Sequence, residues 1–196
     1  MKLSLHFSLA TLVLATVALI SGCATNDGCD DDCCKVDVKT ISLYNGRDLT
    51  GWGYKTNNFD GKTEAIDGRY SAKGDSLVVN PGKGLAQLWT TRQFSNNFVL
   101  TIEFRAAVNA DSGIFIRQPQ LQCRDYLVAG PWKNLTKYKP QDWNEIVVTV
   151  KDGLAHSTCN GEVLGDDMKV PATGGIGLEA DRGQVEYRKI RLKETP

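Results

Sequence analysis

Hydrophobic and polar residues alternate along much of the chain from Thr40 onward, and Gly, Asn and Asp interrupt the alternation every few residues. The clearest run covers residues 98–105, where Phe, Leu, Ile and Phe would face one side and Val, Thr, Glu and Arg the other. Successive side chains of a β-strand point to opposite faces, so a period of two is typical of a strand with one buried face. The pattern therefore predicts an antiparallel β protein.

Further strands are expected at residues 113–117, 144–151, 154–159, 175–180 and 184–192. Asn160-Gly161 is a strong signal for a two-residue hairpin, because type I′ turns need two residues that tolerate positive φ. Another turn, over residues 109–112, would pair the strands on either side of it. Many short strands separated by turns, without a clear helical period, indicate a two-sheet antiparallel β-sandwich of jelly-roll type.

The first residues have the pattern of an export signal, in which Lys2 precedes an apolar run over residues 3–20. A transmembrane helix is the alternative, since about 20 apolar residues span a bilayer, but Ser, Thr and His interrupt the run. The run ends in Ile-Ser-Gly-Cys at residues 20–23, which resembles the bacterial lipobox, whose cysteine receives a lipid. We expect a signal peptide at 1–22, a lipidated Cys23 with a polar, acidic tether at 23–39, and one domain at 40–196.

Lipidation of Cys23 would anchor the protein in a membrane, because acyl chains contribute about 0.8 kcal/mol per buried CH2. The residue that follows is Ala24 rather than Asp. By the sorting rule of some Gram-negative bacteria, this favours the outer membrane, facing the periplasm. We therefore expect an exported protein of the cell envelope whose lipid partner is reached through Cys23.

Charge and cysteine content narrow the partners further. Lys plus Arg and Asp plus Glu number 23 each, without a basic stripe, so nucleic acid is not an expected partner. Cys29, Cys33 and Cys34 lie in the tether, whereas Cys123 and Cys159 lie in the domain. The last two could form a disulfide if their Cα atoms lie within about 7 Å. The alternative is two separately buried thiols that pack as small apolar residues.

Four landmarks along the domain resemble a known family. They are LYNGRDLTGW at residues 43–52, FVLTIEFR at 98–105 with DSGIFIR at 111–117, DWNE at 142–145, and GGIGLE at 174–179 with QVEYRKIR at 184–191. In this order and spacing they resemble the domain of unknown function 1080 family, also called the 3-keto-disaccharide hydrolase domain. The resemblance implies a concanavalin A-like jelly roll and the cleavage of 3-keto-glycosides.

The implied chemistry needs few groups. A 3-keto group acidifies the C2–H of the sugar, so a modest base can remove that proton, and the enolate can expel the aglycone from C1 before water adds. A positive group, or a divalent cation, would face the enolate oxygen. The sequence has no motif for any other cofactor. The stretch between Arg117 and Trp143 is shorter than in longer members, so a non-catalytic carbohydrate- or envelope-binding domain is the alternative function.

Candidate catalytic residues follow from the alternation. Glu103 and Arg105 share the outward face of their strand, and Arg117 and Glu179 would join them in one cleft if their strands lie in the same sheet. A ladder of cross-strand ion pairs is the alternative for such residues. Expected substrate contacts at the rim of this cleft are Asp125, Tyr126, Trp132, Asp181 and Arg182. Trp132 would either stack on a sugar ring or fill the interior of the sandwich.

Overall fold

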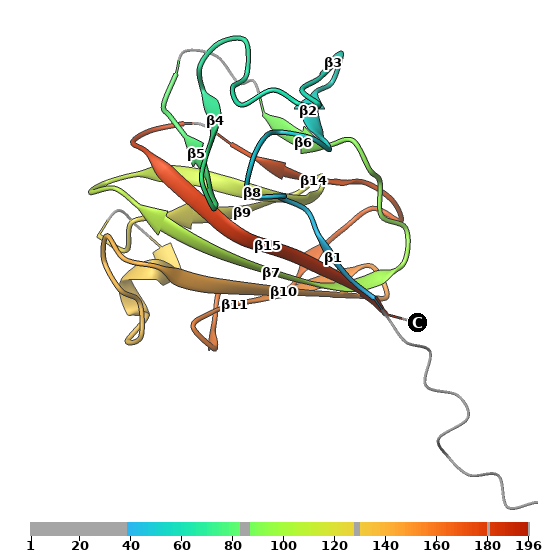
Figure 1. Ribbon diagram of the computed structural model, residues 1–196. Helices are drawn as coiled ribbons and strands as arrows, with labels where there is room; N and C mark the ends of the chain where they lie inside the picture. Colours follow the sequence, from blue (N-terminus) through green and yellow to red (C-terminus); the bar gives the residue numbers. More distant parts are fainter. Residues whose placement is uncertain (1–38, 83–86, 128–129, 180, 196) are drawn as a thin grey trace, which may run out of the picture. The chain divides into compact units, whose positions relative to one another are not determined.

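The computed structural model describes residues 39–82, 87–127, 130–179 and 181–195 (Figure 1). The described chain forms two antiparallel sheets and one short 3-10 helix, η1 (Gly130–Asn134). Sheet A contains β1 (Thr40–Ser42), β4 (Tyr70–Lys73), β5 (Ser76–Val79), β7 (Asn97–Ala106), β10 (Asn144–Lys151), β11 (Leu154–Cys159), β12 (Glu162–Val163), β13 (Met168–Lys169) and β15 (Val185–Thr195). Sheet B contains β2 (Trp52–Tyr54), β3 (Asn57–Asn58), β6 (Leu88–Thr90), β8 (Asp111–Arg117), β9 (Gln120–Arg124) and β14 (Gly175–Leu178). The predicted two-sheet β-sandwich is confirmed.

The two sheets are stacked, and in Figure 1 the long central strands of sheet A lie beneath sheet B. Sheet A runs β12-β11-β10-β7-β15-β5-β4, with β1 paired to β15 and β13 paired to β11. Sheet B runs β3-β2-β6-β14-β8-β9. Neighbouring strands in both sheets are antiparallel. Connections such as those from β7 to β8 and from β14 to β15 run from one sheet to the other.

The predicted strands agree with the structure where the alternation is strongest. Along β7, buried and half-buried residues alternate without a break. The strands expected at residues 144–151 and 154–159 are β10 and β11, with the same bounds. Asn160 and Gly161 have φ values of 48° and 81° and join β11 to β12. Both values are positive, as a type I′ hairpin requires.

One predicted pairing is wrong. The segment at residues 109–112 does not pair β7 with β8, because β7 pairs with β10 and β15 whereas β8 pairs with β9 and β14. The chain instead crosses from sheet A to sheet B at Ala110, which is fully buried. The two strands therefore bury their apolar faces in the core from opposite sides. Alternation specifies which face of a strand is buried, but not which sheet the strand joins.

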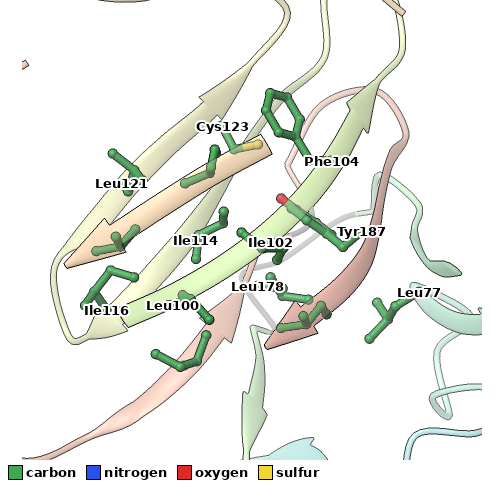
Figure 2. Packing of buried hydrophobic residues seen from close by; sticks show 14 of the residues in the cluster. Leu77, Leu100, Ile102, Phe104, Ile114, Ile116, Leu121, Cys123, Leu178 and Tyr187 are labelled. Carbon is green, nitrogen blue, oxygen red and sulfur yellow. The ribbon is translucent and has the colours of Figure 1, made fainter. Parts of the chain in front are cut away.

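The core lies between the sheets (Figure 2). Figure 2 shows side chains from both sheets in this interior, among them Ile102 and Phe104 of β7 and Ile114 of β8, and all three are fully buried. Each such side chain contributes about 1.5–3 kcal/mol relative to an exposed one. This shared interior holds the two sheets together and sets which residues must face outward.

The two cysteines of the domain are buried and do not form a disulfide. Burial raises the pKa of the Cys123 thiol well above its ordinary value and that of Cys159 to about 12. The interpretation as two buried thiols is therefore confirmed. The expected signal peptide, Cys23 and almost all of the tether lie outside the described residues. Within the described ranges, no helix is long and apolar enough to cross a membrane.

Candidate active site on the outer face of sheet B

The predicted four-residue cleft does not form. Glu103 and Arg105 lie on β7 in sheet A, whereas Arg117 ends β8 and Glu179 follows β14, both in sheet B. Outward residues of opposite sheets face away from each other across the whole thickness of a sandwich, which is about 10 Å between the sheets alone. The prediction of a single cleft is therefore wrong, for the same reason as the predicted pairing of β7 with β8.

Sheet A carries a ladder of ion pairs on its outer face. The Glu103 carboxylate accepts hydrogen bonds from Arg188 Nε and Lys189 Nζ, each at 2.7 Å, and Arg105 pairs with Glu186 at 2.9 Å. Desolvation acts to raise the pKa of Glu103, but the hydrogen bonds and charges of Lys189 and Arg188 outweigh it and hold the pKa below its ordinary value. A carboxylate that is already paired in this way is a weak base, so the ion-pair alternative describes this face.

Arg117 is bound by the protein itself. Its two terminal nitrogens donate hydrogen bonds to the backbone carbonyls of Pro171 at 2.8 Å and Asn96 at 2.6 Å, and the guanidinium lies 5.3 Å from the ring centre of Phe98. Desolvation lowers the pKa of this guanidinium. The side chain therefore ties two loops to the end of β8.

Two of the expected rim residues are buried. The Asp125 carboxylate is fully buried and accepts hydrogen bonds from the Asn109 backbone N–H at 2.8 Å and from Gln141 Nε2 at 3.2 Å. Trp132 is 1% exposed and packs edge-to-face on Phe104, with 5.5 Å between ring centres. The structure does not place either residue at a rim, because the connection after β9 folds back over the open end of the core.

The remaining rim residues lie at the margins of the domain. Tyr126 is half-buried and packs on Tyr138, with 5.3 Å between ring centres. Asp181 and Arg182 are exposed beyond the end of β14. Arg182 Nε donates a hydrogen bond to the Asn109 carbonyl at 3.1 Å, so this arginine is partly engaged with the turn between the sheets.

A pocket of about 850 Å³ opens on sheet B, within the range of about 300–1,000 Å³ that small-molecule sites occupy. Its aromatic wall is formed by Trp89 of β6 and Phe115 of β8, whose ring centres are 5.2 Å apart. Gly177 of β14 lies between them, and a Cβ atom there would come within 2.9 Å of the Trp89 ring. The glycine therefore lets the indole lie flat across β14.

Polar side chains, most of them neutral, complete the pocket. Its other side chains are Tyr54, Lys55, Thr56, Asn57, Asn58, Gln87, Thr90, Thr91, Gln93, Arg117 and Gln118. Among these lining residues, Lys55 and Arg117 carry the only charges, and Lys55 forms no ion pair with another described residue. Aromatic rings with amides and hydroxyls around them suit a neutral ligand that has both an apolar face and many hydroxyl groups.

Glu179 lies on the same outer face of sheet B as this pocket, although it is not one of the lining residues. Gly177 shares the face of Trp89 and Phe115, and Glu179 lies two residues further along, so its side chain points to the same side. The backbone N–H of Glu179 donates to the Gly113 carbonyl at 2.9 Å, and the carboxylate accepts a hydrogen bond from Gln120 Nε2. These contacts hold the carboxylate beside the aromatic wall.

The electrostatic setting of Glu179 differs from that of Glu103. Desolvation raises the pKa of Glu179, the negative charges of Asp181 and Asp111 raise it further, and the hydrogen bond from Gln120 opposes the rise. A carboxylate without a cationic partner, partly removed from water, is a better proton acceptor than an ion-paired one. Of the four predicted catalytic residues, Glu179 has the setting that a general base needs.

Sequence reasoning missed the aromatic wall and Gln120. Phe115 alternates with the buried Ile114 and Ile116, so the period of two places it on the outward face of the expected strand. Trp89 lies in a strand of three residues, which is too short for a visible period. Among the described residues, no group of three or more His, Cys, Asp and Glu side chains could hold a metal ion.

Two solved structures from one bacterium have the same fold. A presumed glycosyl hydrolase from Parabacteroides distasonis ATCC 8503 is 17% identical, with a TM-score of 0.64, over 80% of this chain and 94% of that one. A second presumed glycosyl hydrolase from the same organism is also 17% identical, with a TM-score of 0.59, over 80% of this chain and all of that one. At this identity the likeness concerns the fold. No curated protein matches the chain.

The sequence model of one family spans nearly the whole described domain. The 3-keto-alpha-glucoside-1,2-lyase-like domain matches residues 39–193. The match contains both sheets, the aromatic pocket and Glu179, and it agrees with the resemblance that the four sequence landmarks carry. The chain belongs to the 3-keto-alpha-glucoside-1,2-lyase-like domain family.

Proposed function

We propose that this protein cleaves 3-keto-glycosides on the outer face of sheet B, with Glu179 as the base that removes the C2 proton. The observation that carries the proposal is the position of Glu179, a partly desolvated carboxylate that forms no ion pair with a described residue and lies on the same face of sheet B as the aromatic pocket. Membership of the family supports the reaction class. The aromatic rings, amides and hydroxyl groups of the pocket support a sugar as the ligand.

The reaction follows from the acidity of the substrate. Glu179 takes the proton from C2, and the electron pair of that C–H bond passes into the enolate of the 3-keto group. The enolate then re-forms the ketone and a C1–C2 double bond while the C1–O bond breaks. The aglycone leaves with the electron pair of the C1–O bond and receives the proton that Glu179 took from C2. Water adds its hydroxyl to C1 and its proton to C2, which gives net hydrolysis. One carboxylate is sufficient, unlike the opposed pair of an ordinary glycosidase.

The pocket residues have supporting roles. Trp89 and Phe115 stack on the apolar face of the sugar ring, and the amide side chains bond its hydroxyl groups. Lys55, on the turn between β2 and β3, has the unpaired positive charge that an enolate oxygen requires. A divalent cation would supply the same stabilisation and is tested by adding a chelator.

The test is turnover of a 3-keto-glucoside with a chromogenic aglycone, followed by absorbance. We expect release of the aglycone from the oxidised glucoside and none from the same glucoside with a hydroxyl at C3, because only the ketone acidifies C2–H. Lys55→Gln should lower kcat more than Lys55→Arg. Equal cleavage of both glucosides would contradict the proposal, and so would no cleavage of either.

Carbohydrate binding without turnover is the second candidate. The observation that favours it is the pocket itself, whose lining residues are mostly neutral amides, hydroxyls and aromatic rings, with no carboxylate among them. Calorimetry with 3-keto and ordinary glycosides distinguishes the two functions. Saturable binding that needs Trp89, together with no product at long times, would support the binding function and exclude the enzyme.

A further inference from the structure

Gln120 and Glu179 meet across an intervening strand. Gln120 begins β9, Glu179 follows β14, and β8 lies between those two strands in sheet B. Backbones two strands apart are separated by about 9.5 Å. The hydrogen bond from Gln120 Nε2 to the Glu179 carboxylate must therefore pass over the outer face of β8.

Gly113 provides the passage. A Cβ atom on Gly113 would lie 2.0 Å from Gln120 Nε2 and 2.5 Å from Gln120 Cγ. Any other residue at this position would occupy the space through which the glutamine side chain runs. The φ of Gly113 is not in the left-handed region, so its backbone does not require glycine. The space above the strand is therefore what the glycine supplies.

The direction of the Gln120 amide is set from the far end of β9. Arg124 Nε donates to Asp111 at 2.8 Å and to Gln122 Oε1 at 3.0 Å, and a guanidinium can only donate. Gln122 must therefore turn its oxygen to Arg124 and its nitrogen to Gln120 Oε1, at 2.9 Å. With its oxygen occupied, Gln120 presents its nitrogen to Glu179. We call Arg124, Gln122 and Gln120 the amide ladder.

We propose that the amide ladder and the passage over Gly113 form a positioning device, which holds the Glu179 carboxylate in one orientation toward the aromatic pocket. The proposal rests on the function of Glu179 as the base. Gln120 is the positioning residue, because it touches Glu179 and is not one of the residues that line the pocket. A carboxylate with one oxygen held by a donor keeps the other oxygen free and aimed, which is what proton transfer over a short distance needs.

The groups around Glu179 determine in which direction its pKa should move when Gln120 is replaced. Asp181 on its own segment and Asp111 on β8 carry negative charge, and both raise the pKa of Glu179. On β4, the Tyr70 hydroxyl donates to the Leu178 carbonyl, and burial raises the pKa of this phenol. Arg124 on β9 is engaged with Asp111. Gln120 thus opposes the acidic neighbours, and its removal should raise the pKa of Glu179 further.

The first experiment compares Gln120→Met with Gln184→Met, since methionine keeps the length of glutamine without its donor. Gln184 is an exposed amide that bonds Asn80 away from the pocket. An NMR titration of the Glu179 side-chain carboxyl in the free protein should show a raised pKa in Gln120→Met and the wild-type value in Gln184→Met. On the 3-keto-glucoside, kcat should fall about 10- to 100-fold, with little change in KM, and the acid limb of the pH profile should move to higher pH.

The second experiment is a double-mutant cycle that combines Gly113→Ala with Gln120→Ala. In the wild-type background, the new methyl group should displace Gln120 and reproduce the Gln120→Met shift. In a Gln120→Ala background the obstructed side chain is gone, so Gly113→Ala should have no further effect. Circular dichroism and thermal melting check that each variant folds.

Two outcomes would overturn the positioning device. One is an unchanged titration of Glu179 in Gln120→Met, and the other is an equal effect of Gly113→Ala with and without Gln120. Absence of turnover by the wild-type protein is a different failure. It would exclude the proposed function, while the titration of the free protein would still decide whether the ladder acts on Glu179.

Discussion

Glu103 and Glu179 both point outward from a sheet, but their surroundings shift their pKa values in opposite directions. Arg188 and Lys189 hold Glu103 as a paired anion, whereas Glu179 faces acidic neighbours and a neutral amide. The two residues therefore form a matched pair for mutation. The same chemical change at each site separates the loss of a base from the loss of a surface charge.

Glu179→Gln should lower kcat/KM on a 3-keto-glucoside by about 10²–10⁴-fold, the range expected when a general base is removed. Glu103→Gln should stay close to wild type, because Glu103 lies on the opposite sheet and is already paired. Initial rates with both variants decide the point. A large loss in Glu103→Gln with a small one in Glu179→Gln would reverse our assignment of the two faces.

The raised pKa of Glu179 also affects stability. A carboxyl group that binds its proton more tightly in the folded chain destabilises the fold once it ionises. This cost is absent below the ordinary glutamate pKa of about 4.3, and it develops as the pH rises through the higher folded value. Glu179→Gln should therefore equal wild type at acidic pH and exceed it at neutral pH. Urea unfolding at about pH 4 and pH 8 tests this, and a variant that is less stable at neutral pH would contradict it.

At the scale of elements, two glycines are needed for different reasons. Gly161 has a φ of 81° with open space where a Cβ atom would lie, so glycine is needed there for the backbone conformation. Gly177 has an ordinary φ but lies under the Trp89 ring, so its requirement is steric. A hairpin glycine thus supports the fold, and a strand glycine shapes the pocket.

Alanine at each position should separate these roles. Gly161→Ala should lower the free energy of unfolding by about 1–2 kcal/mol and leave KM unchanged. Gly177→Ala should push the indole of Trp89 away from β14 and raise KM on the 3-keto-glucoside. Chemical denaturation and steady-state kinetics measure the two effects. An unchanged KM in Gly177→Ala would show that the flat position of Trp89 does not matter for binding.

For the molecule as a whole, Trp132 closes the interior near η1. It contacts Phe104 and Tyr138 and is almost fully buried. Trp132→Ala should cost about 3–5 kcal/mol, as large aromatic deletions in cores do, and Trp132→Phe should cost less. Urea denaturation measures both. If Trp132→Ala instead kept full stability and lost glycan binding, the tryptophan would be a ligand contact after all.

The residues of the proposed membrane anchor lie outside the described chain. We propose that Cys23 is lipidated, since Ile-Ser-Gly-Cys at residues 20–23 resembles a lipobox. Cys23→Ser should move the protein from the membrane fraction to the soluble fraction without changing the melting temperature of the domain. Fractionation and mass spectrometry of the mature protein test this. An unmodified Cys23 in the wild-type protein would contradict the proposal.

The longer strands and the family could be predicted from the sequence alone. Alternation along β7, β10 and β11 predicts their bounds well, because a strand at the boundary of a core must place apolar side chains at every second position. Asn160-Gly161 predicts its hairpin, because that turn depends on local backbone preferences alone. Ordered landmarks from residue 43 to residue 191 carry the family resemblance, and the family is confirmed.

Only the tertiary structure decided which outward residues share a face. Glu103 and Glu179 have equivalent patterns in the sequence, but the crossing at Ala110 puts β7 and β8 in different sheets. Sheet membership depends on contacts between distant segments, and a period of two is the same in either sheet. For the same reason, the passage of Gln120 over Gly113 to Glu179 appears only once β9, β8 and β14 lie side by side.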